Sequence, residues 1–337
     1  MKTIIVTGGA GFIFSHFIRK LLKSYPDYLI INIDCLTYCG NLLNTKDFEN
    51  NPNYKFIQVS INDYDKIGEI FKEYKPEIVI SAASETHVDN SIKNPKSFIE
   101  TDVLGVFNIA YWALKTNVKR VIHISTDEVV KPFKEEEVSI DAKLNPGSPY
   151  AASKACSELL IKSYINTYNL PAIIIRPCNA YGPNQYAEKL IPTTIARLAS
   201  GKKALLHGSG KEIREWLYVD DICRAVDYIT HYGKLSEVYH VGSEYRLTNL
   251  QVIIMIIKYM FGNVDYSKFI EQVQNRPGND HLYKLDSSKT IDEFGDYRVV
   301  NFKDGLKLTI QWYLNNPDFW KNIDLECNRY NGSDYLR

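Results

Sequence analysis

A tyrosine and a lysine four residues apart, Tyr150 and Lys154, are the clearest candidates for acid–base chemistry. Positions i and i+4 of a helix share one face, so the lysine ammonium would lie beside the phenol. A neighbouring positive charge lowers the pKa of a phenol, which would let Tyr150 accept a proton from a hydroxyl group near neutral pH. Because this spacing is common by chance, the pair needs support from other parts of the sequence.

A glycine-rich segment between an apolar run and a helical pattern supplies the first support. Gly8 would make the tight turn out of a strand, and Gly11 would let the backbone approach a pyrophosphate at a helix N-terminus. Asp34 ends the next apolar run, where a carboxylate binds a ribose 2′-hydroxyl and repels a 2′-phosphate. These features predict a site for NAD rather than NADP. Phe14 replaces the third glycine of the pattern, which leaves the local helix packing in question.

Two adjacent carboxyl side chains, Asp127 and Glu128, follow a short apolar run that ends at Ser125 and Thr126. Neighbouring carboxyls can act as an acid and a base when their surroundings separate their pKa values. A solvated loop is the ordinary explanation for such a pair. We favour the chemical interpretation because a strand end would place both groups beside the nicotinamide.

The elements that must position these residues alternate between short apolar runs and longer helical patterns, as in a parallel sheet covered on both faces. We expect strands at Ile4–Thr7, Leu29–Asp34, Lys55–Val59, Ile78–Ser81, Val121–Ser125 and Ile173–Arg176. We expect helices at Gly11–Ser24, Asp63–Tyr74, Ser97–Lys115 and Tyr150–Tyr168. The fold class is therefore α/β, with a doubly wound parallel sheet.

Beyond residue 180 the pattern loosens into short elements, without a composition break that would mark a linker. We expect an NAD-binding domain over residues 1–180, to which some later segments return. A smaller mixed lobe over 181–320 would bind the substrate, and a polar tail would cover 321–337.

The composition excludes several classes of function. The chain has 40 Lys and Arg against 40 Asp and Glu, and a chain without surplus positive charge is a poor candidate for binding nucleic acid. Its apolar runs are too short to cross a bilayer, and its six cysteines lack the spacing of a zinc site. We expect a cytoplasmic protein with no metal, no membrane contact and no nucleic-acid partner.

The segment 123–129 reads HISTDEV and, together with Tyr150 and Lys154, resembles the signature of nucleotide-sugar 4,6-dehydratases in the extended short-chain dehydrogenase/reductase family. The adjacent Asp127 and Glu128 separate these dehydratases from the sugar 4-epimerases of the same family. The resemblance continues to about residue 320, through blocks at 24–28, 34–41, 85–91, 181–185, 188–192, 214–218 and 276–278. It implies a Rossmann domain and a smaller substrate lobe.

The resemblance implies a redox-neutral reaction on tightly held NAD, in which a nucleoside-diphosphate glucose becomes a 4-keto-6-deoxy sugar on the way to rhamnose or other deoxysugar nucleotides. The catalytic residues would be Thr126, Asp127, Glu128, Tyr150 and Lys154. The NAD-binding residues would be Gly8, Gly11, Phe12, Ile13, Asp34, Ile61, Ala83, Tyr150 and Lys154. The substrate-binding residues would be His87, Asn179, Glu188, Lys189, Leu190, His207, Arg214, Asn249, Arg276 and Tyr283.

Several details favour UDP-glucose over dTDP-glucose as the substrate. The runs SYPDY, THVDNS and YGPNQ resemble the dehydratase domain of plant-type UDP-rhamnose synthases. His207 begins the sequence HGSG, where dTDP enzymes more usually carry Tyr-Gly-Asp-Gly. The resemblance also implies a homodimer, in which the helices expected at Ser97–Lys115 and Tyr150–Tyr168 form a four-helix bundle with their copies.

Four positions depart from the family pattern. Val130 replaces a tyrosine, Ser60 an aspartate that commonly contacts adenine, Asp102 an asparagine, and Ala180 the second residue of an Asn-Asn pair. None of these changes removes a catalytic group.

Two other functions stay open at this point. A UDP-sugar 4-epimerase or decarboxylase would share the glycine turn, Asp34, Tyr150 and Lys154, but it would not need the pair Asp127–Glu128. A catalytically silent NAD-binding regulator would need none of the catalytic residues, which are all present.

Overall fold

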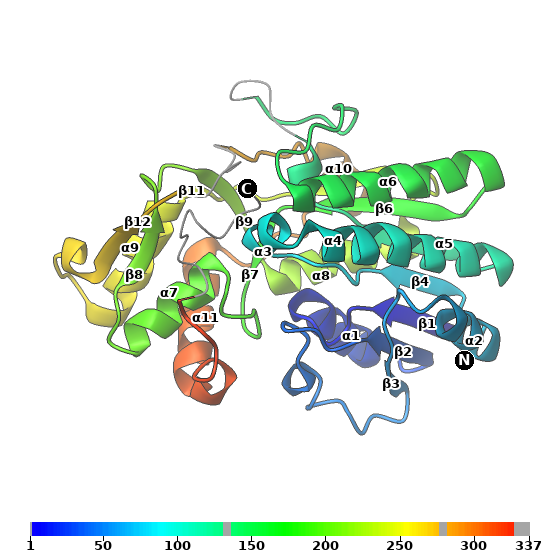
Figure 1. The fold of residues 1–337 in the computed structure, drawn as a ribbon, viewed down its shortest axis with the longest axis horizontal. Helices are drawn as coiled ribbons and strands as arrows, with labels where there is room; N and C mark the ends of the chain where they lie inside the picture. Colours follow the sequence, from blue (N-terminus) through cyan, green and yellow to red (C-terminus); the bar gives the residue numbers. More distant parts are fainter. Residues whose placement is uncertain (1, 131–135, 276–281, 327–337) are drawn as a thin grey trace.

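The computed structural model describes residues 2–130, 136–275 and 282–326. Its larger part is a seven-stranded parallel sheet in the order β10-β6-β5-β4-β1-β2-β3 (Figure 1). The strands are β1 (Lys2–Thr7), β2 (Tyr28–Asp34), β3 (Tyr54–Gln58), β4 (Ile78–Ser81), β5 (Arg120–Ile124), β6 (Ala172–Pro177) and β10 (Val238–Val241). All six predicted strands are present, with ends within two residues of those expected.

Helices cover both faces of this sheet, which confirms the doubly wound fold. Ile4 and Val6 of β1 pack in the cluster beneath α1 and α8, whereas Ile5 between them packs beneath α2, α5 and α6. The strands are therefore buried on both sides, as continuous apolar runs predict. The helices are α1 (Phe12–Ser24), α2 (Tyr64–Tyr74), α5 (Val106–Lys115), α6 (Pro149–Tyr168), α8 (Val219–Tyr232) and α10 (Ser288–Phe294).

The helix expected over Ser97–Lys115 changes its winding along its length. It begins as α4 (Pro95–Phe98), widens into a π-helical turn over Ile99–Gly105, and continues as α5. A side chain at Gly105 would place its Cβ 2.5 Å from Cδ1 of Ile61, so glycine permits this close approach.

The smaller part of the molecule has its own core, in which α7, α9 and α11 pack on short strands. A three-stranded sheet has the order β11-β9-β7, and β12 pairs with β8. The strands are β7 (Asn179–Tyr181), β8 (Ala204–His207), β9 (Ile213–Tyr218), β11 (Arg246–Thr248) and β12 (Ile270–Val273). The helices are α7 (Leu190–Ala199), α9 (Asn249–Phe261) and α11 (Phe302–Asn315). A short helix, α3 (Val88–Lys93), lies in the loop after β4.

The end of the described chain packs on the smaller part. Arg197 of α7 is buried and donates hydrogen bonds to the carbonyl of Leu325 (2.9 Å) and to Glu326 (2.8 Å). The rest of the expected polar tail lies outside the described residues. None of the helices within the described ranges is long and apolar enough to cross a membrane.

Candidate active site

The glycine turn at the start of α1 adopts a backbone that requires glycine. Gly8 has φ +74°, and a Cβ at this position would lie 2.8 Å from the Cα of Ala83. Gly11 is the N-cap of α1 and has no side chain that could occupy the first N–H groups of the helix. A helix N-terminus left open in this way is suited to an anion such as a pyrophosphate.

Asp34 is held at the end of β2 beside this turn. Its Oδ1 accepts a hydrogen bond from the N–H of Leu36 (2.8 Å), and its Oδ2 accepts one from Ala10 (3.0 Å). Burial raises the pKa of Asp34, and these two hydrogen bonds oppose that rise. These hydrogen bonds fix the carboxylate beside the glycine turn; its contact with a ribose stays a prediction.

Phe14 does not displace the helix. Its side chain is buried in the core, and its ring packs edge-to-face on Phe17 with 5.9 Å between the ring centroids. Phe14 also borders the cavity at the glycine turn. The larger residue is accommodated because the ring turns into the apolar layer between α1 and the sheet.

Tyr150 and Lys154 lie in the first turns of α6, which Ser148 caps by accepting a hydrogen bond from Ala151 (3.1 Å). Both side chains are buried, and Nζ of Lys154 donates to the carbonyl of Ile124 at 2.6 Å.

The expectation of a lowered Tyr150 pKa was wrong for this structure. Burial and the charge of Glu128 raise the pKa of Tyr150, although a hydrogen bond with Thr126 opposes them. The spacing placed Tyr150 and Lys154 on one face of α6, but it could not show how deeply the phenol is buried.

The carboxyl pair follows β5 in a 3₁₀ turn over Asp127–Val129. Thr126 caps this turn: its hydroxyl accepts a hydrogen bond from the N–H of Glu128 (3.3 Å) and donates to Oδ1 of Asp127 (3.1 Å). Burial, followed by the charges of Glu128 and Glu215, raises the pKa of Asp127 to about 8. Asp127 is therefore protonated near neutral pH, as a general acid must be.

Two adjoining cavities bring the predicted residues together. The first is lined by every predicted NAD-binding and catalytic residue: Gly8, Gly11, Phe12, Ile13, Asp34, Ile61, Ala83, Thr126, Asp127, Glu128, Tyr150 and Lys154. The second is lined by eight of the ten predicted substrate residues: His87, Asn179, Glu188, Lys189, Leu190, His207, Arg214 and Asn249. Glu128 lines both cavities, together with Asn179, Glu188 and Lys189.

A buried histidine between two carboxylates forms one wall of the second cavity. Nε2 of His87 lies 3.7 Å from Asp89, and its Nδ1 lies 3.7 Å from Glu188. Burial lowers the pKa of His87, so the ring is neutral near pH 7. Lys189 donates to the carbonyl of Thr86 at 2.6 Å, which holds the start of α7 against the loop after β4.

Arg214 of β9 also lines the second cavity, and it is only 6% exposed. Its guanidinium stacks over the ring of Tyr283, 4.6 Å from the ring centroid. Tyr283 thus supports Arg214 and does not itself line either cavity. Arg276 lies outside the described residues.

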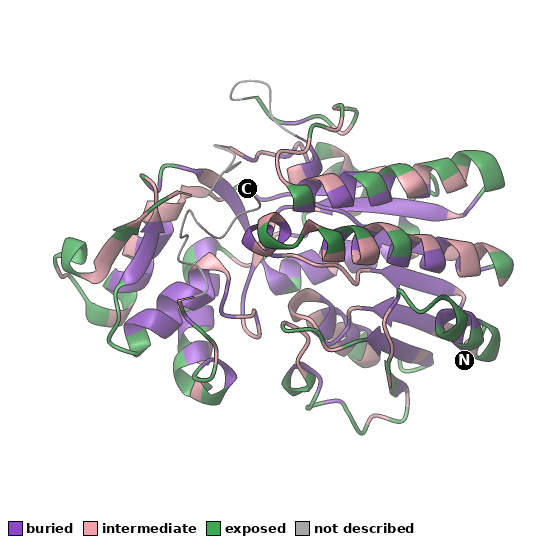
Figure 2. Ribbon diagram, viewed as in Figure 1, coloured by how far each residue is buried: buried purple, intermediate pink, exposed green. Residues whose placement is uncertain are grey.

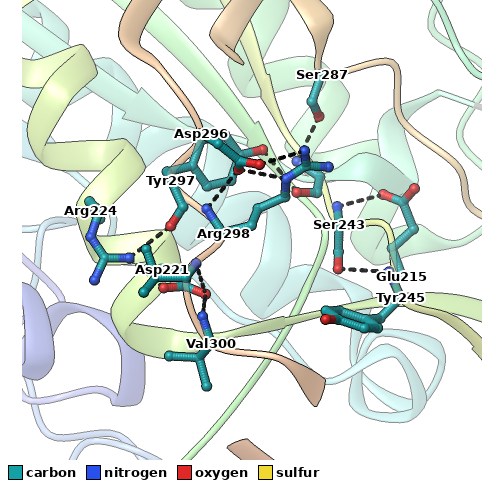
Figure 3. A network of polar contacts seen from close by, with 12 residues as sticks. Glu215, Asp221, Arg224, Ser243, Tyr245, Ser287, Asp296, Tyr297, Arg298 and Val300 are labelled. Atoms are coloured by element: carbon teal, nitrogen blue, oxygen red, sulfur yellow. Dashed lines mark hydrogen bonds and ion pairs between the residues drawn. The ribbon is translucent and has the colours of Figure 1, made fainter. Parts of the chain in front are cut away.

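The carboxylate of the neighbouring Glu215 joins β9 to the residues that follow β10. It accepts a hydrogen bond from Arg246 (3.0 Å). It also accepts one from the N–H of Ser243 (3.4 Å) (Figure 3). Figure 3 also shows that Asp221, at the start of α8, accepts a hydrogen bond from the N–H of Val300 (2.9 Å). These contacts join β9 and α8 to the segments that follow β10 and α10.

The sequence did not identify several residues around the cavities. Tyr38 donates to Glu188 (3.1 Å), and Ser84 follows β4 in the lining of the first cavity. The position of Ser84 could have been inferred, because the carboxyl ends of parallel strands form the ligand-binding edge.

The family departures have separate consequences. Ser60 and Ala180 line the first cavity, and Val130 packs in the core. The fourth, Asp102, is fully buried.

Comparisons with known proteins agree with this geometry. The NAD dependent epimerase/dehydratase family matches residues 4–242. A dTDP-glucose 4,6-dehydratase of Neisseria meningitidis is 37% identical and covers 96% of both chains. A trifunctional UDP-glucose 4,6-dehydratase, epimerase and reductase of Arabidopsis thaliana is also 37% identical, over 96% of this chain and 49% of the relative.

A solved structure is similar over almost the whole chain. DesIV, a dTDP-glucose 4,6-dehydratase from Streptomyces venezuelae crystallised with NAD, superposes with a TM-score of 0.91 and 38% identity, covering 95% of this chain and 99% of that one. The glycine turn, Asp34 and the paired carboxyls beside Tyr150 therefore occur in a chain that belongs, with NAD as its cofactor, to the nucleotide-sugar 4,6-dehydratases of the extended short-chain dehydrogenase/reductase family.

Proposed function

We propose that the chain converts UDP-glucose to UDP-4-keto-6-deoxyglucose, an early step towards rhamnose or another deoxysugar nucleotide. The observation that carries this proposal is the position of Glu128, which lines both cavities beside a protonated Asp127 and the phenol of Tyr150. Such a junction offers one base for oxidation at C4, a second base for C5 and an acid for the departing hydroxyl.

The first cavity fits NAD. The missing side chain at Gly8 leaves the glycine turn open beside Ala83, and Asp34 provides the ribose contact. When bound there, NAD would supply a reversible hydride acceptor, so the conversion would need no added reductant.

The residues of this chain then move the protons. Tyr150 takes the proton of the glucose 4-hydroxyl, and its hydrogen bond with Thr126 works against the rise in its pKa that burial causes. We assign the supporting positive charge to Lys154, four residues further along α6. The resulting 4-ketone acidifies the proton on C5, which Glu128 removes. Asp127 protonates the C6 hydroxyl as it leaves, so one water is lost. Oδ2 of Asp127 is buried and has no hydrogen-bond partner among the described residues. A proton on this oxygen would therefore be available to the C6 hydroxyl of the substrate.

The second cavity would hold the nucleotide-sugar. Arg214 and Lys189 are the cations of its lining, and a guanidinium binds a diphosphate through charge-assisted hydrogen bonds. Asn179 and Asn249 add amide groups, and we also assign Arg276 to substrate binding on the family resemblance.

The choice of uracil rests on the loop that follows β8. His207 lies in the second cavity with Leu190 and Asn249, and it begins the HGSG sequence that separates this chain from the usual dTDP enzymes. Overall identity does not decide between the bases, because relatives named for dTDP-glucose and for UDP-glucose are both 37% identical.

The function is tested by incubating the purified protein with UDP-glucose and dTDP-glucose side by side, without reductant. We expect a 4-keto-6-deoxy product from both and a higher kcat/KM for UDP-glucose. A higher kcat/KM for dTDP-glucose would overturn the base assignment alone. Galactose products identified by NMR would indicate an epimerase, and no turnover of either sugar would refute the dehydratase proposal.

We also propose a homodimer through α5 and α6, which lie side by side on one face of the molecule (Figure 1). Leu104 in the π turn and Leu159 of α6 are each 55% exposed. Figure 2 shows exposed positions along both α5 and α6. Light scattering should give twice the chain mass of 38.7 kDa, and Leu159→Glu should give the monomer. A monomeric unmodified protein would refute the dimer.

A further inference from the structure

One fully buried carboxyl beside the active site has no part in the proposed proton transfers. Asp102 lies in the π-helical turn Ile99–Gly105, and its side chain is 0% exposed. A π turn inserts an extra residue into a helix and is often found at functional sites. In this chain the turn packs against α6, the helix that carries Tyr150 and Lys154.

The carboxylate of Asp102 joins three elements around the catalytic turn. Its Oδ2 accepts a hydrogen bond from the hydroxyl of Ser153 (2.6 Å), and its Oδ1 accepts one from the N–H of Glu85 (3.2 Å). Ser153 lies between Tyr150 and Lys154 in the sequence, and its hydroxyl is also 2.8 Å from the carbonyl of Tyr150. The π turn, α6 and the loop after β4 thus meet at this one group.

Asp102 is also the main negative charge acting on Lys154. Burial lowers the pKa of Lys154, and the charge of Asp102, followed by that of Glu158, opposes this change. Burial likewise raises the pKa of Asp102, and the charge of Lys154 is the largest effect against it.

Other titratable groups lie around this pair, among them the buried His123 of β5, on which the charge of Lys154 acts. Glu158 is engaged by Arg176 and by Lys162 (2.7 Å). Glu85 faces Asp102 from the loop after β4, and Tyr150 faces it from α6. Two opposite charges that are both buried stabilise each other strongly, because little solvent screens them.

We propose that Asp102 is a positioning residue that supplies the counter-charge for Lys154 and thereby sets the pH range in which Tyr150 and Lys154 work. This inference rests on the proposed roles of those two residues. The family pattern that this sequence resembles has asparagine at this position, which would preserve the shape and one acceptor oxygen without the charge. The chain therefore contains a charge that the common family sequence does not provide.

The variant Asp102→Asn tests the charge directly. Without the negative charge, both Tyr150 and Lys154 should lose their protons more readily. Both limbs of the pH profile of kcat/KM should therefore move to lower pH, by about one unit.

Glu100→Gln is the matched control for this variant. It removes the same charge from the same π turn, but the side chain of Glu100 is 44% exposed and pairs with Lys96 at the surface. Solvent screens a charge in this position, so the control profile should not move. An unchanged or oppositely shifted profile for Asp102→Asn would overturn the proposal.

A second readout does not require turnover. The tyrosinate absorbance of the NAD-loaded protein, minus that of Tyr150→Phe, reports the ionisation of Tyr150. The same difference in the Asp102→Asn background should show ionisation at lower pH. If the unmodified enzyme acts on neither sugar, the proposed function fails, while this titration still decides the charge coupling.

Folding is controlled by a second substitution, Asp102→Ser, which also removes the charge. A shift in whichever variant folds supports the proposal. If both variants fail to fold while Glu100→Gln folds, the role of Asp102 is structural and the proposal is overturned.

Discussion

The two cavities would bind anionic ligands through different chemical groups. The cavity at the glycine turn offers backbone N–H groups at the start of α1 and depends on the missing side chain of Gly8. The second cavity offers the side chain of Arg214, and Lys189 lies where the two cavities join. A chain with 40 basic and 40 acidic residues can therefore bind two diphosphates. Backbone N–H groups would bind one of them, and a few charged side chains would bind the other.

We expect the largest loss of NAD affinity when a methyl group is added at the glycine turn. Gly8→Ala combines a strained φ of +74° with a backbone contact at 2.8 Å that cannot relax through a side chain. We expect NAD affinity to fall by about 100-fold or more, measured by calorimetry and by the NAD content of the purified protein.

Gly201→Ala is the control for that change. Gly201 has φ +73°, but a Cβ there would meet nothing within 4 Å. This variant should lose about 1 kcal/mol of unfolding free energy and keep its NAD affinity. Equal NAD affinities for the two alanine variants would show that the clash at Ala83 is unimportant.

Substrate binding in the second cavity should depend on the charge of its side chains rather than on the shape of its backbone. We expect Arg214→Ala to raise the KM for UDP-glucose by about 10- to 100-fold, since it removes a charge-assisted contact worth roughly 1.5–3 kcal/mol, and to leave NAD binding unchanged.

Arg298→Ala provides the matched loss of a guanidinium, because Arg298 pairs with Asp296 (2.8 Å) and lines neither cavity. Its kinetics should equal those of the unmodified enzyme. A weaker affinity for NAD in Arg214→Ala would contradict the division of labour between the cavities.

The smallest expected effect concerns stability at the junction of the cavities. Asp127 has a folded pKa of about 8, above its unfolded value near 3.9, so the folded state binds more protons between these values. Its contribution to stability is complete below about pH 4 and is lost as the pH rises through about 8.

Asp127→Asn should therefore gain unfolding free energy relative to the unmodified protein at each step as the pH rises from about 4 to about 8. Denaturant titrations across this range measure the difference. A difference that does not vary with pH would show that Asp127 is ionised in the folded state.

The sequence predicted the sheet well, and the residues predicted to bind NAD lie along one cavity. Strands buried on both faces appear as uninterrupted apolar runs, so β1 to β6 were located to within two residues. Parallel strands end at a common edge, which brought Asp34, Thr126 and the turn at Gly8 together.

Features that depend on distant packing were not predictable. The π turn at Ile99–Gly105 depends on the approach of Gly105 to Ile61, and the stacking of Tyr283 under Arg214 joins residues far apart in the sequence. The pKa of Tyr150 was misjudged because burial, which the spacing cannot reveal, outweighs its hydrogen bond with Thr126.

In the proposed mechanism, the oxidation at C4 and the removal of the C5 proton use different residues at the junction of the cavities. This assignment is tested most directly by mixing NAD-loaded Glu128→Gln with UDP-glucose and recording NADH absorbance, with Tyr150→Phe as the control. We predict that NADH forms and persists in Glu128→Gln, since C4 is oxidised but the C5 proton stays, and that none forms in Tyr150→Phe. Full turnover by Glu128→Gln, or no NADH in a folded, NAD-loaded sample, would contradict the account.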